Sequence, residues 1–297
     1  MTTSSMPGGA DVTPESVLSI GATLGEGPVW TGDRLWFVDI KEHRLYRHDP
    51  ATGMLDMWHA PDQIGWALPT ERGDMIVGVK TGLHRFSPDT GAFTLLHDPE
   101  PSRPDNRLND AATDPAGRIW LGSMHDAETE ASGALYRFDR GHCVHAGLPE
   151  VVITNGPAIS ADGRTLWHTD TLGKTIWRVA VDEDGALGQA EPFVTIEDGG
   201  GWPDGCVIDA EGCLWTGLFG GWGVRRYDPA GKLMATVKFP VANITKIAFG
   251  GPDLRTAYAT TARKGLSPAE LEQQPFAGNV FAFDPGVSGL PVCPANS

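Results

Sequence analysis

Short stretches in which apolar and polar residues alternate recur along the chain, each after a turn. This pattern is typical of half-buried β-strands. Six of the stretches share one form: GDRLWFVD, RGDMIVGV, AGRIWLGS, DGRTLWHT, EGCLWTGL and DLRTAYAT. The positions at which they align are Trp36, Ile76, Trp120, Trp167, Trp215 and Tyr258. The steps between these positions are 40, 44, 47, 48 and 43 residues, so the chain contains six repeats.

A second strand of a common type follows each aligned stretch, as in RLYRHDPATG and GLHRFSPDTG, and leads into another turn. Each repeat therefore supplies about four short strands. Four-stranded units at this period are typical of β-propeller blades around a central channel. We predict an all-β, six-bladed β-propeller that forms a single domain over residues 16–297, after a flexible tail over residues 1–15. The segment from Val17 to Ile20 is expected to add the outer strand of the last blade and close the ring.

Helix is scarce in this pattern. Only the segment from Ser267 to Gln274 is predicted to be helical, because Ser-Pro-Ala-Glu forms an N-terminal capping box. Five tryptophans fall at positions expected to pack between blades rather than bind a ligand. They are Trp36, Trp120, Trp167, Trp177 and Trp215.

Composition narrows the possible partners and the compartment. The formal net charge is -15, which argues against nucleic acid and against an anionic membrane surface. The chain has no apolar run long enough to span a bilayer and no signal-peptide core near its start, so we predict a cytoplasmic protein. The four cysteines form no CxxC pair and are expected to be free thiols, although Cys206 and Cys213 could face each other across a hairpin.

Candidate chemistry appears at one equivalent point of the repeats. Counting back 10 to 12 residues from each aligned position reaches the residue expected just before the innermost strand, at the mouth of the channel. The six residues found there are Glu26, Gly65, Asn109, Asn155, Asp204 and Lys246. Asn-Gly and Pro-Asp-Gly also favour turns, so any one of these residues alone has a plain turn interpretation. The shared offset favours convergence of the acids and amides around the axis.

Two carboxylates and amide oxygens around one axis would suit a hard or borderline divalent cation. Ca²⁺, Mg²⁺ and Mn²⁺ fit such oxygen donors, and Zn²⁺ or Fe²⁺ would be tolerated. Two long loops are expected on the same face, SMHDAETEASG and TTARKGLSPAELEQQPFAG. A covalent mechanism is disfavoured, because the chain has no GxSxG motif and no cysteine in an expected top loop beside a histidine that the sequence can identify.

A string of ordered motifs carries a family resemblance over residues ~20 to 283: LGEGPVW, WFVDIK, RLNDAATDPAGRIWLGSMHD, ITNGP, HTDTL, WPDGCVIDAEGCLW and TTARKGL. The chain resembles the SMP30/gluconolactonase family, which includes regucalcin, and within it the bacterial sugar lactonases of the xylonolactonase type. The resemblance implies that Glu26, Asn155 and Asp204 bind one divalent cation. It also implies that Arg107 and Asn109 contact the substrate. Asp126 and Glu128 are both candidates for an acidic contact with sugar hydroxyls.

The implied reaction is metal-dependent hydrolysis of a sugar-acid lactone to the aldonic acid. A pentonolactone such as xylonolactone or arabinonolactone is expected, or gluconolactone. The cation would polarise the carbonyl, and Asp204 is the candidate general base for the attacking water. Trp202 is expected to cover the apolar face of the sugar ring. Two alternatives stay open at this point: a regucalcin-like metal-binding regulatory propeller without turnover, and a scaffold propeller whose channel holds nothing.

Overall fold

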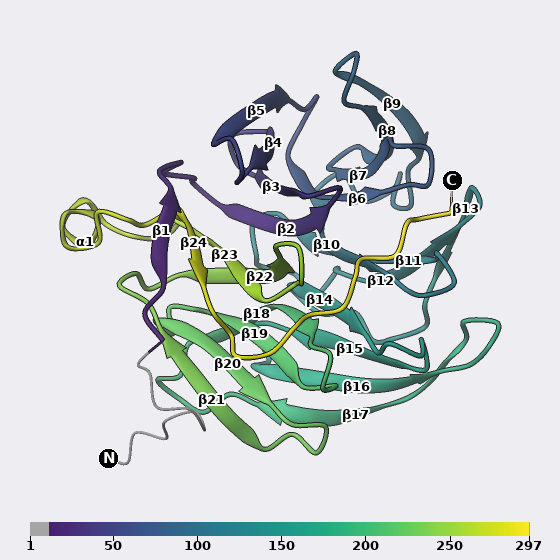
Figure 1. The fold of residues 1–297 in the computed structure, drawn as a ribbon. Coiled ribbons are helices and arrows are strands. Elements are labelled where there is room, and N and C mark those ends of the chain that lie inside the picture. The colour runs from purple at the N-terminus through teal and green to yellow at the C-terminus, as the bar shows by residue number, and fades with distance from the viewer. Residues whose placement is uncertain (1–11, 297) are drawn as a thin grey trace.

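Six antiparallel sheets of four strands each surround a central channel in the computed structural model, which describes residues 12–296 (Figure 1). The first blade consists of β2 (Gly25–Thr31), β3 (Arg34–Asp39), β4 (Arg44–Asp49) and β5 (Met54–His59). The second consists of β6 (Ile64–Pro69), β7 (Met75–Val79), β8 (Gly82–Ser87) and β9 (Ala92–His97). The third consists of β10 (Asn106–Thr113), β11 (Ile119–His125), β12 (Leu135–Asp139) and β13 (His142–His145).

The remaining blades continue in the same order around the ring. The fourth consists of β14 (Thr154–Ile159), β15 (Thr165–Asp170), β16 (Thr175–Val181) and β17 (Leu187–Thr195). The fifth consists of β18 (Trp202–Ile208), β19 (Leu214–Phe219), β20 (Gly223–Tyr227) and β21 (Leu233–Lys238). The sixth consists of β22 (Ile244–Gly250), β23 (Thr256–Thr261), β24 (Val280–Phe283) and β1 (Glu15–Leu18). The six-bladed propeller predicted from the repeats is therefore confirmed.

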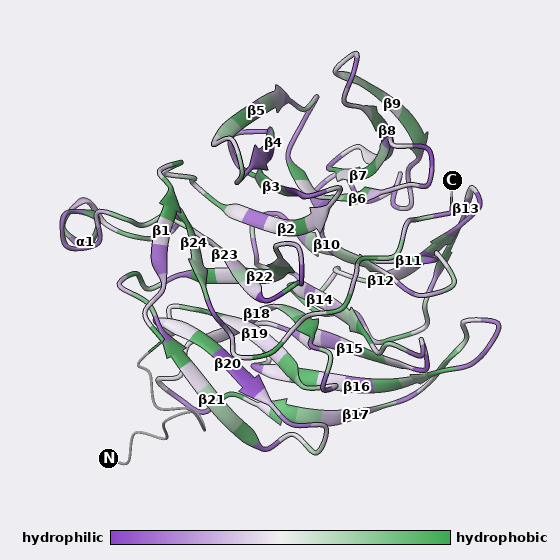
Figure 2. Ribbon diagram, viewed as in Figure 1, coloured by the Kyte–Doolittle hydropathy of each residue, from purple (hydrophilic) through white to green (hydrophobic). Residues whose placement is uncertain are grey.

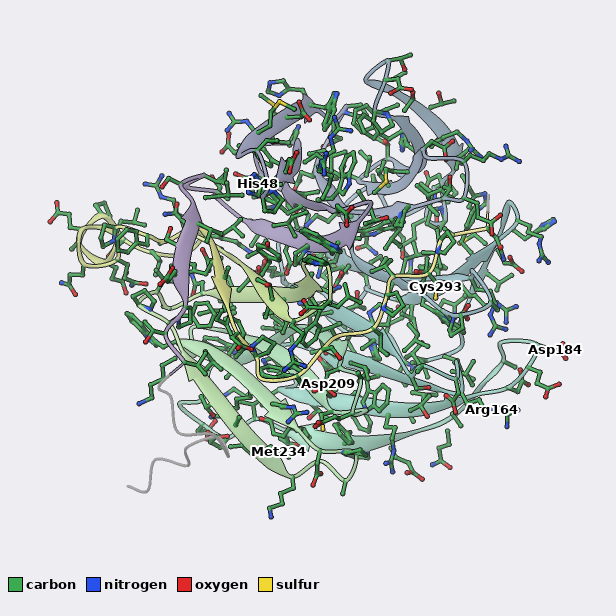
Figure 3. All side chains as sticks on the ribbon, in the orientation of Figure 1. His48, Arg164, Asp184, Asp209, Met234 and Cys293 are labelled. Carbon is green, nitrogen blue, oxygen red and sulfur yellow. The ribbon has the colours of Figure 1, made fainter. Side chains whose placement is uncertain are left out.

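The two ends of the chain close the ring in different ways. β1 pairs with β24, as predicted, although the strand begins at Glu15 rather than Val17. Residues 1–11 of the predicted tail lie outside the described residues. At the other end, the segment after β24 crosses one face of the ring (Figure 1), and Figure 3 labels Cys293 on it. The amide of Ala295 donates to the carbonyl of Pro69 at 2.7 Å, which joins this segment to the second blade.

Packing between neighbouring blades forms the core. Trp36 packs with Phe86 of the next blade, and the rings of Trp120, Trp167 and Trp215 are buried in the same way against the blade that follows each of them. Trp177 is different, because it lies only half-buried on β16. Its strand is the third of the blade and pairs with the outer strand β17, so this position was wrongly predicted to belong to the core.

Buried aspartates fasten the turns that carry these tryptophans. Oδ1 of Asp209 accepts the amides of Glu211 and Cys213, and Oδ2 accepts Trp215 Nε1 at 2.8 Å. Asp209, which Figure 3 labels, lies in the turn between β18 and β19. Asp114 binds its own turn and Trp120 Nε1 in the same manner. One carboxylate thus fixes both a hairpin turn and the ring that fills the space beside it.

The helix and the free cysteines match the sequence-based predictions. The predicted helix is present as α1 (Pro268–Gln273), with both hydrogen bonds of the capping box to Ser267. All four cysteines are free, and Cys206 lies opposite Thr216 rather than Cys213. Hydrophobic residues line many of the strands and hydrophilic ones many of the turns, as Figure 2 shows. Within residues 12–296, no helix has the length and apolar character needed to cross a membrane.

Candidate active site at the channel mouth

The six equivalent residues lie inside the innermost strands, not just before them as the sequence indicated. Each innermost strand slips in register against its neighbour beside this point; in β2, for example, the slip falls between Glu26 and Val29. The others slip in the same place along the strand. A β-bulge of this kind bends a strand and re-aims a side chain. One local distortion, repeated in every blade, therefore positions the whole set.

Asn155 shows the correction most clearly, because its Asn-Gly-Pro sequence indicated a turn. It lies in β14, and the register shift falls between Asn155 and Ala158. Gly156 has a φ of +69°, and Gly27, which follows Glu26, has a φ of +55°. Few residues other than glycine adopt this conformation, and a Cβ at position 156 would lie 2.9 Å from Cys206 Sγ. These glycines serve bulges in the innermost strands.

Two buried carboxyl groups, Glu26 and Asp204, form the acidic part of the site. They are 4% and 6% exposed. Burial, reinforced by the charge of Asp204, raises the pKa of Glu26 well above its ordinary value. Burial likewise raises the pKa of Asp204 to about 7, and the charge of Asp110 adds to this. The charge of Asp204 acts on Glu26, so the two carboxyls are neighbours in the site. A divalent cation between these groups would offset both of their negative charges.

A chain of hydrogen bonds orients the two amides. Arg107 Nη1 donates to Asn109 Oδ1 at 2.6 Å. Asn109 Nδ2 then donates to Asn155 Oδ1 at 2.9 Å, and Asn155 Nδ2 donates to the Thr171 hydroxyl. Each of the two amide oxygens accepts one hydrogen bond and keeps a second lone pair, so each has the chemistry to ligate a cation. Asn109 also orients Asn155 and connects it to Arg107.

A buried ion pair, which the sequence did not indicate, lies beneath this set. Lys246 Nζ donates to both oxygens of Asp110, at 2.6 and 2.8 Å, across the channel from the sixth blade to the third. Both residues are buried. Lys246 does occupy the equivalent position in its blade, and Asp110 follows Asn109, but no pattern in the sequence links the two. Together they supply no net charge to the site above them.

The two acidic candidates in the third-blade loop have different surroundings. Asp126 Oδ1 accepts from Lys41 and Arg107, and Oδ2 accepts from Gln63 and Lys80. Four donors thus saturate this carboxylate. Burial alone would raise the pKa of Asp126, but the hydrogen bonds from Lys41 and Gln63 and the nearby positive charges outweigh it and hold the pKa far below its ordinary value. Glu128 instead lines the central cavity, where it forms an ion pair with Lys264.

The cavity above the carboxyl pair has a volume of about 250 Å³. Its polar lining includes Glu26, Arg107, Asn109, Glu128, Asn155, Asp204 and Lys264. Leu172, Trp202 and Phe219 form an apolar wall. Asp126 is absent from the lining and bonds to Arg107, which lines it. Trp202 is 42% exposed, so its ring is available to a ligand.

A second cavity, of about 290 Å³, opens below Lys246, and its lining is mostly apolar, with no carboxylate. A third cavity, of about 320 Å³, is lined by Asp62, Asp98 and Glu100 and by Lys80 and Arg107. Of these three cavities, only the first is lined by Glu26, Asn155 and Asp204. Among residues 12–296, no three His, Cys, Asp or Glu side chains gather into a metal-binding group. The donor set proposed here differs from such a group because its third member is an amide. Two carboxylates and an amide oxygen nevertheless match the donors that divalent cations of the Ca²⁺ and Mg²⁺ class accept.

The fold and the site define a six-bladed propeller with an oxygen-lined pocket at one mouth of its channel. The chain belongs to the family described as the SMP-30/gluconolactonase/LRE-like region, which matches residues 24–263. It is 34% identical over 271 residues to a 6-deoxy-6-sulfogluconolactonase of Pseudomonas putida, covering 90% of this chain and 93% of that protein. It is 32% identical over 290 residues to a pentonolactonase of Haloferax volcanii, covering 94% and 97%.

Solved structures agree with this assignment. The structure of a calcium-binding protein, regucalcin, from Agrobacterium tumefaciens superposes with a TM-score of 0.91. The two sequences are 28% identical, and the match covers 96% of this chain and 98% of that one. The fold and the family predicted from the sequence are thus both confirmed.

Proposed function

We propose that this protein hydrolyses a sugar-acid lactone to the aldonic acid, with one divalent cation held by Glu26, Asn155 and Asp204. The observation that carries the proposal is the convergence of two carboxyls and an oriented amide oxygen at the base of a cavity rimmed by hydrogen-bonding groups. Relatives named as lactonases for sulfogluconolactone and pentonolactone support the reaction class. Xylonolactone, arabinonolactone and gluconolactone are the neutral substrates we would test first, and a cytoplasmic location fits the four free thiols.

The residues divide the work as follows. When bound, the cation supplies Lewis acidity at the lactone carbonyl. Asp204 has a carboxylate oxygen to receive the proton of the attacking water. Asn109 and Arg107 hold the ring and its hydroxyls, because both line the cavity, Asn109 Oδ1 keeps a lone pair, and Arg107 Nη2 has no acceptor among the described residues. Glu128 accepts from a sugar hydroxyl, and Trp202 covers an apolar face of the ring.

A metal-binding role without turnover is the second candidate, and the structural likeness to a calcium-binding regucalcin favours it. The same three ligands would serve both functions. The two candidates differ in whether substrate turns over, so kinetics separates them and metal affinity alone does not.

The test is a panel of lactones assayed against a panel of metals. Protein stripped with a chelator and reloaded with Ca²⁺, Mg²⁺, Mn²⁺, Zn²⁺ or Fe²⁺ should open at least one sugar lactone well above the spontaneous rate. The stripped protein should lose this activity. Metal binding without hydrolysis of any lactone would favour the regulatory alternative, and the absence of bound metal would leave only a scaffold.

Asn155→Ala should weaken metal binding by about tenfold or more, because it removes one neutral oxygen ligand, while costing the metal-free fold about 1–2 kcal/mol. Calorimetric titration with the metal and urea unfolding in chelator measure the two effects separately. The matched control is Asn279→Ala, which removes another buried amide, one that accepts from the amide of Gly21 and donates to the Ser16 hydroxyl outside the cavity lining. The control should lose comparable stability and retain its metal affinity. A larger stability loss for Asn155→Ala with unchanged metal affinity would make Asn155 structural.

A further inference from the structure

Cationic side chains gather at the channel mouth of a strongly acidic protein. Lys41, Lys80 and Lys264 lie in the turns after the second strands of the first, second and sixth blades, and Arg107 lies on β10. We call these four side chains the cationic rim. Asp126 and Glu128, from the equivalent loop of the third blade, are the carboxylates that pair with them. The rim thus has two positive charges more than its paired carboxylates, although the chain carries a net -15.

The rim retains unused hydrogen-bond donors. The Lys80 ammonium meets one acceptor, Asp126 at 3.2 Å, and the Lys41 ammonium meets two, Asp126 and Gln63. An ammonium group has three donors. Arg107 is 3% exposed and lines the cavity, and its Nη2 has no acceptor among the described residues. These donors are available to an added ligand.

The cations also crowd one another. Burial, and after it the charges of Arg107 and Lys264, lower the pKa of Lys41. An anion bound among these like charges would reduce their mutual repulsion. Asp126 supplies one negative charge, but its two oxygens already accept from four donors. It therefore cannot neutralise the remaining positive charge of the rim.

The rim adjoins the proposed reaction centre through one continuous line of contacts. Asn155 bonds Asn109, Asn109 bonds Arg107, and Arg107 shares Asp126 with Lys41. Arg107 and Lys264 line the cavity itself. A lactone whose carbonyl lies at the carboxyl pair would therefore direct its far end toward these cations.

We propose that the cationic rim binds an anionic substituent of the substrate, so that the preferred lactone carries a phosphate, sulfonate or carboxylate group away from its carbonyl. This inference rests on the proposed function and narrows its substrate class. Hydrogen bonds between ammonium or guanidinium donors and an oxyanion are charge-assisted and roughly twice as strong as neutral ones. Neutral sugar lactones would lack this contact and bind more weakly.

The experiment compares glucono-1,5-lactone with its 6-phosphate and its 6-deoxy-6-sulfonate, using metal-loaded enzyme. Wild type should show kcat/KM at least about tenfold higher for one or both anionic lactones, and equal rates for both would mean that charge alone is recognised. Lys41→Met and Lys264→Met should each lower kcat/KM for the anionic lactone by roughly ten- to a hundredfold, and for the neutral lactone much less. Salt at 0.5 M should raise KM only for the anionic lactone.

The control is Lys232→Met, which removes an exposed cation in the β20–β21 turn, at the opposite end of its blade from the turns that follow the second strands. This variant should leave kcat/KM unchanged for both the neutral and the anionic lactone. Equal kcat/KM for neutral and anionic lactones in wild type would overturn the inference. So would an anionic preference that survives in both rim variants, because the rim would then only hold Asp126 in place.

Failure of the proposed function gives a different pattern, in which no lactone is hydrolysed with any metal. Calorimetric titration with 6-phosphogluconate and with gluconate then tests anion binding by the cationic rim independently of turnover. Tighter binding of 6-phosphogluconate, lost in Lys41→Met, would support an anion site in a protein without turnover. Equal binding of the two acids would overturn it.

Discussion

Asp204→Asn should lower kcat/KM for lactone hydrolysis by about a thousandfold or more. The amide cannot take a proton from water, and general-base catalysis alone is worth about 10²–10⁴. It also removes one of the two charged ligands of the proposed cation, which weakens stabilisation of the developing oxyanion. The metal-free fold should keep or gain stability, because the substitution removes a buried charge next to Glu26 and Asp110.

Three measurements separate these effects: steady-state kinetics at saturating metal, calorimetric metal affinity, and urea unfolding in chelator. Asp228→Asn is the matched control, since Asp228 only accepts amides within the β20–β21 turn. It should leave turnover unchanged. If Asp204→Asn keeps turnover within a few-fold of wild type, Asp204 is neither the base nor an essential ligand.

Lys246→Met should cost about 3–5 kcal/mol of unfolding free energy in the metal-free protein, because it leaves Asp110 buried without its partner. The unpaired carboxylate would also lie near Glu26 and Asp204, whose like charges add to the penalty. Asp110→Asn should lower the unfolding free energy by less, since the carboxyls of Glu26 and Asp204 can partly neutralise the charge of Lys246. The double variant Lys246→Met/Asp110→Asn should recover part of the loss.

Urea unfolding of the two single variants and the double variant, all in chelator, gives the coupling between the two residues as a double-mutant cycle. A coupling energy above about 1 kcal/mol is expected for a pair in direct contact. Additive losses, or a loss below about 1 kcal/mol for Lys246→Met, would mean that the ion pair does not hold the two sides of the channel together.

The sequence could predict the propeller because a common strand motif recurs in every blade at steps of 40 to 48 residues. It could also predict that Glu26, Asn155 and Asp204 share a position, since strands at a fixed offset place their residues at equivalent points of a ring. It could not predict that these positions lie inside the strands, because an Asn-Gly or Asp-Gly pair serves a bulge as readily as a turn.

Contacts between side chains of different blades could not be predicted from the sequence for a different reason. The pairing of Lys246 with Asp110 joins residues 136 positions apart, and only the diameter of the channel brings them together. The saturation of Asp126 depends on side chains from three blades, among them Lys41 and Lys80. The loop motif alone therefore left Asp126 and Glu128 equivalent, whereas the structure places only Glu128 on the cavity wall.

The most direct test of the account is lactone turnover measured against the number of metal ions bound per chain. Chelator-stripped protein is titrated with the best metal, and activity and bound metal are determined on the same samples. The account predicts that turnover rises from the spontaneous rate and reaches its plateau at one ion per chain, and that Asp204→Asn shows no such rise. Full turnover in metal-free protein, or a fully loaded site that turns over no lactone, would contradict it.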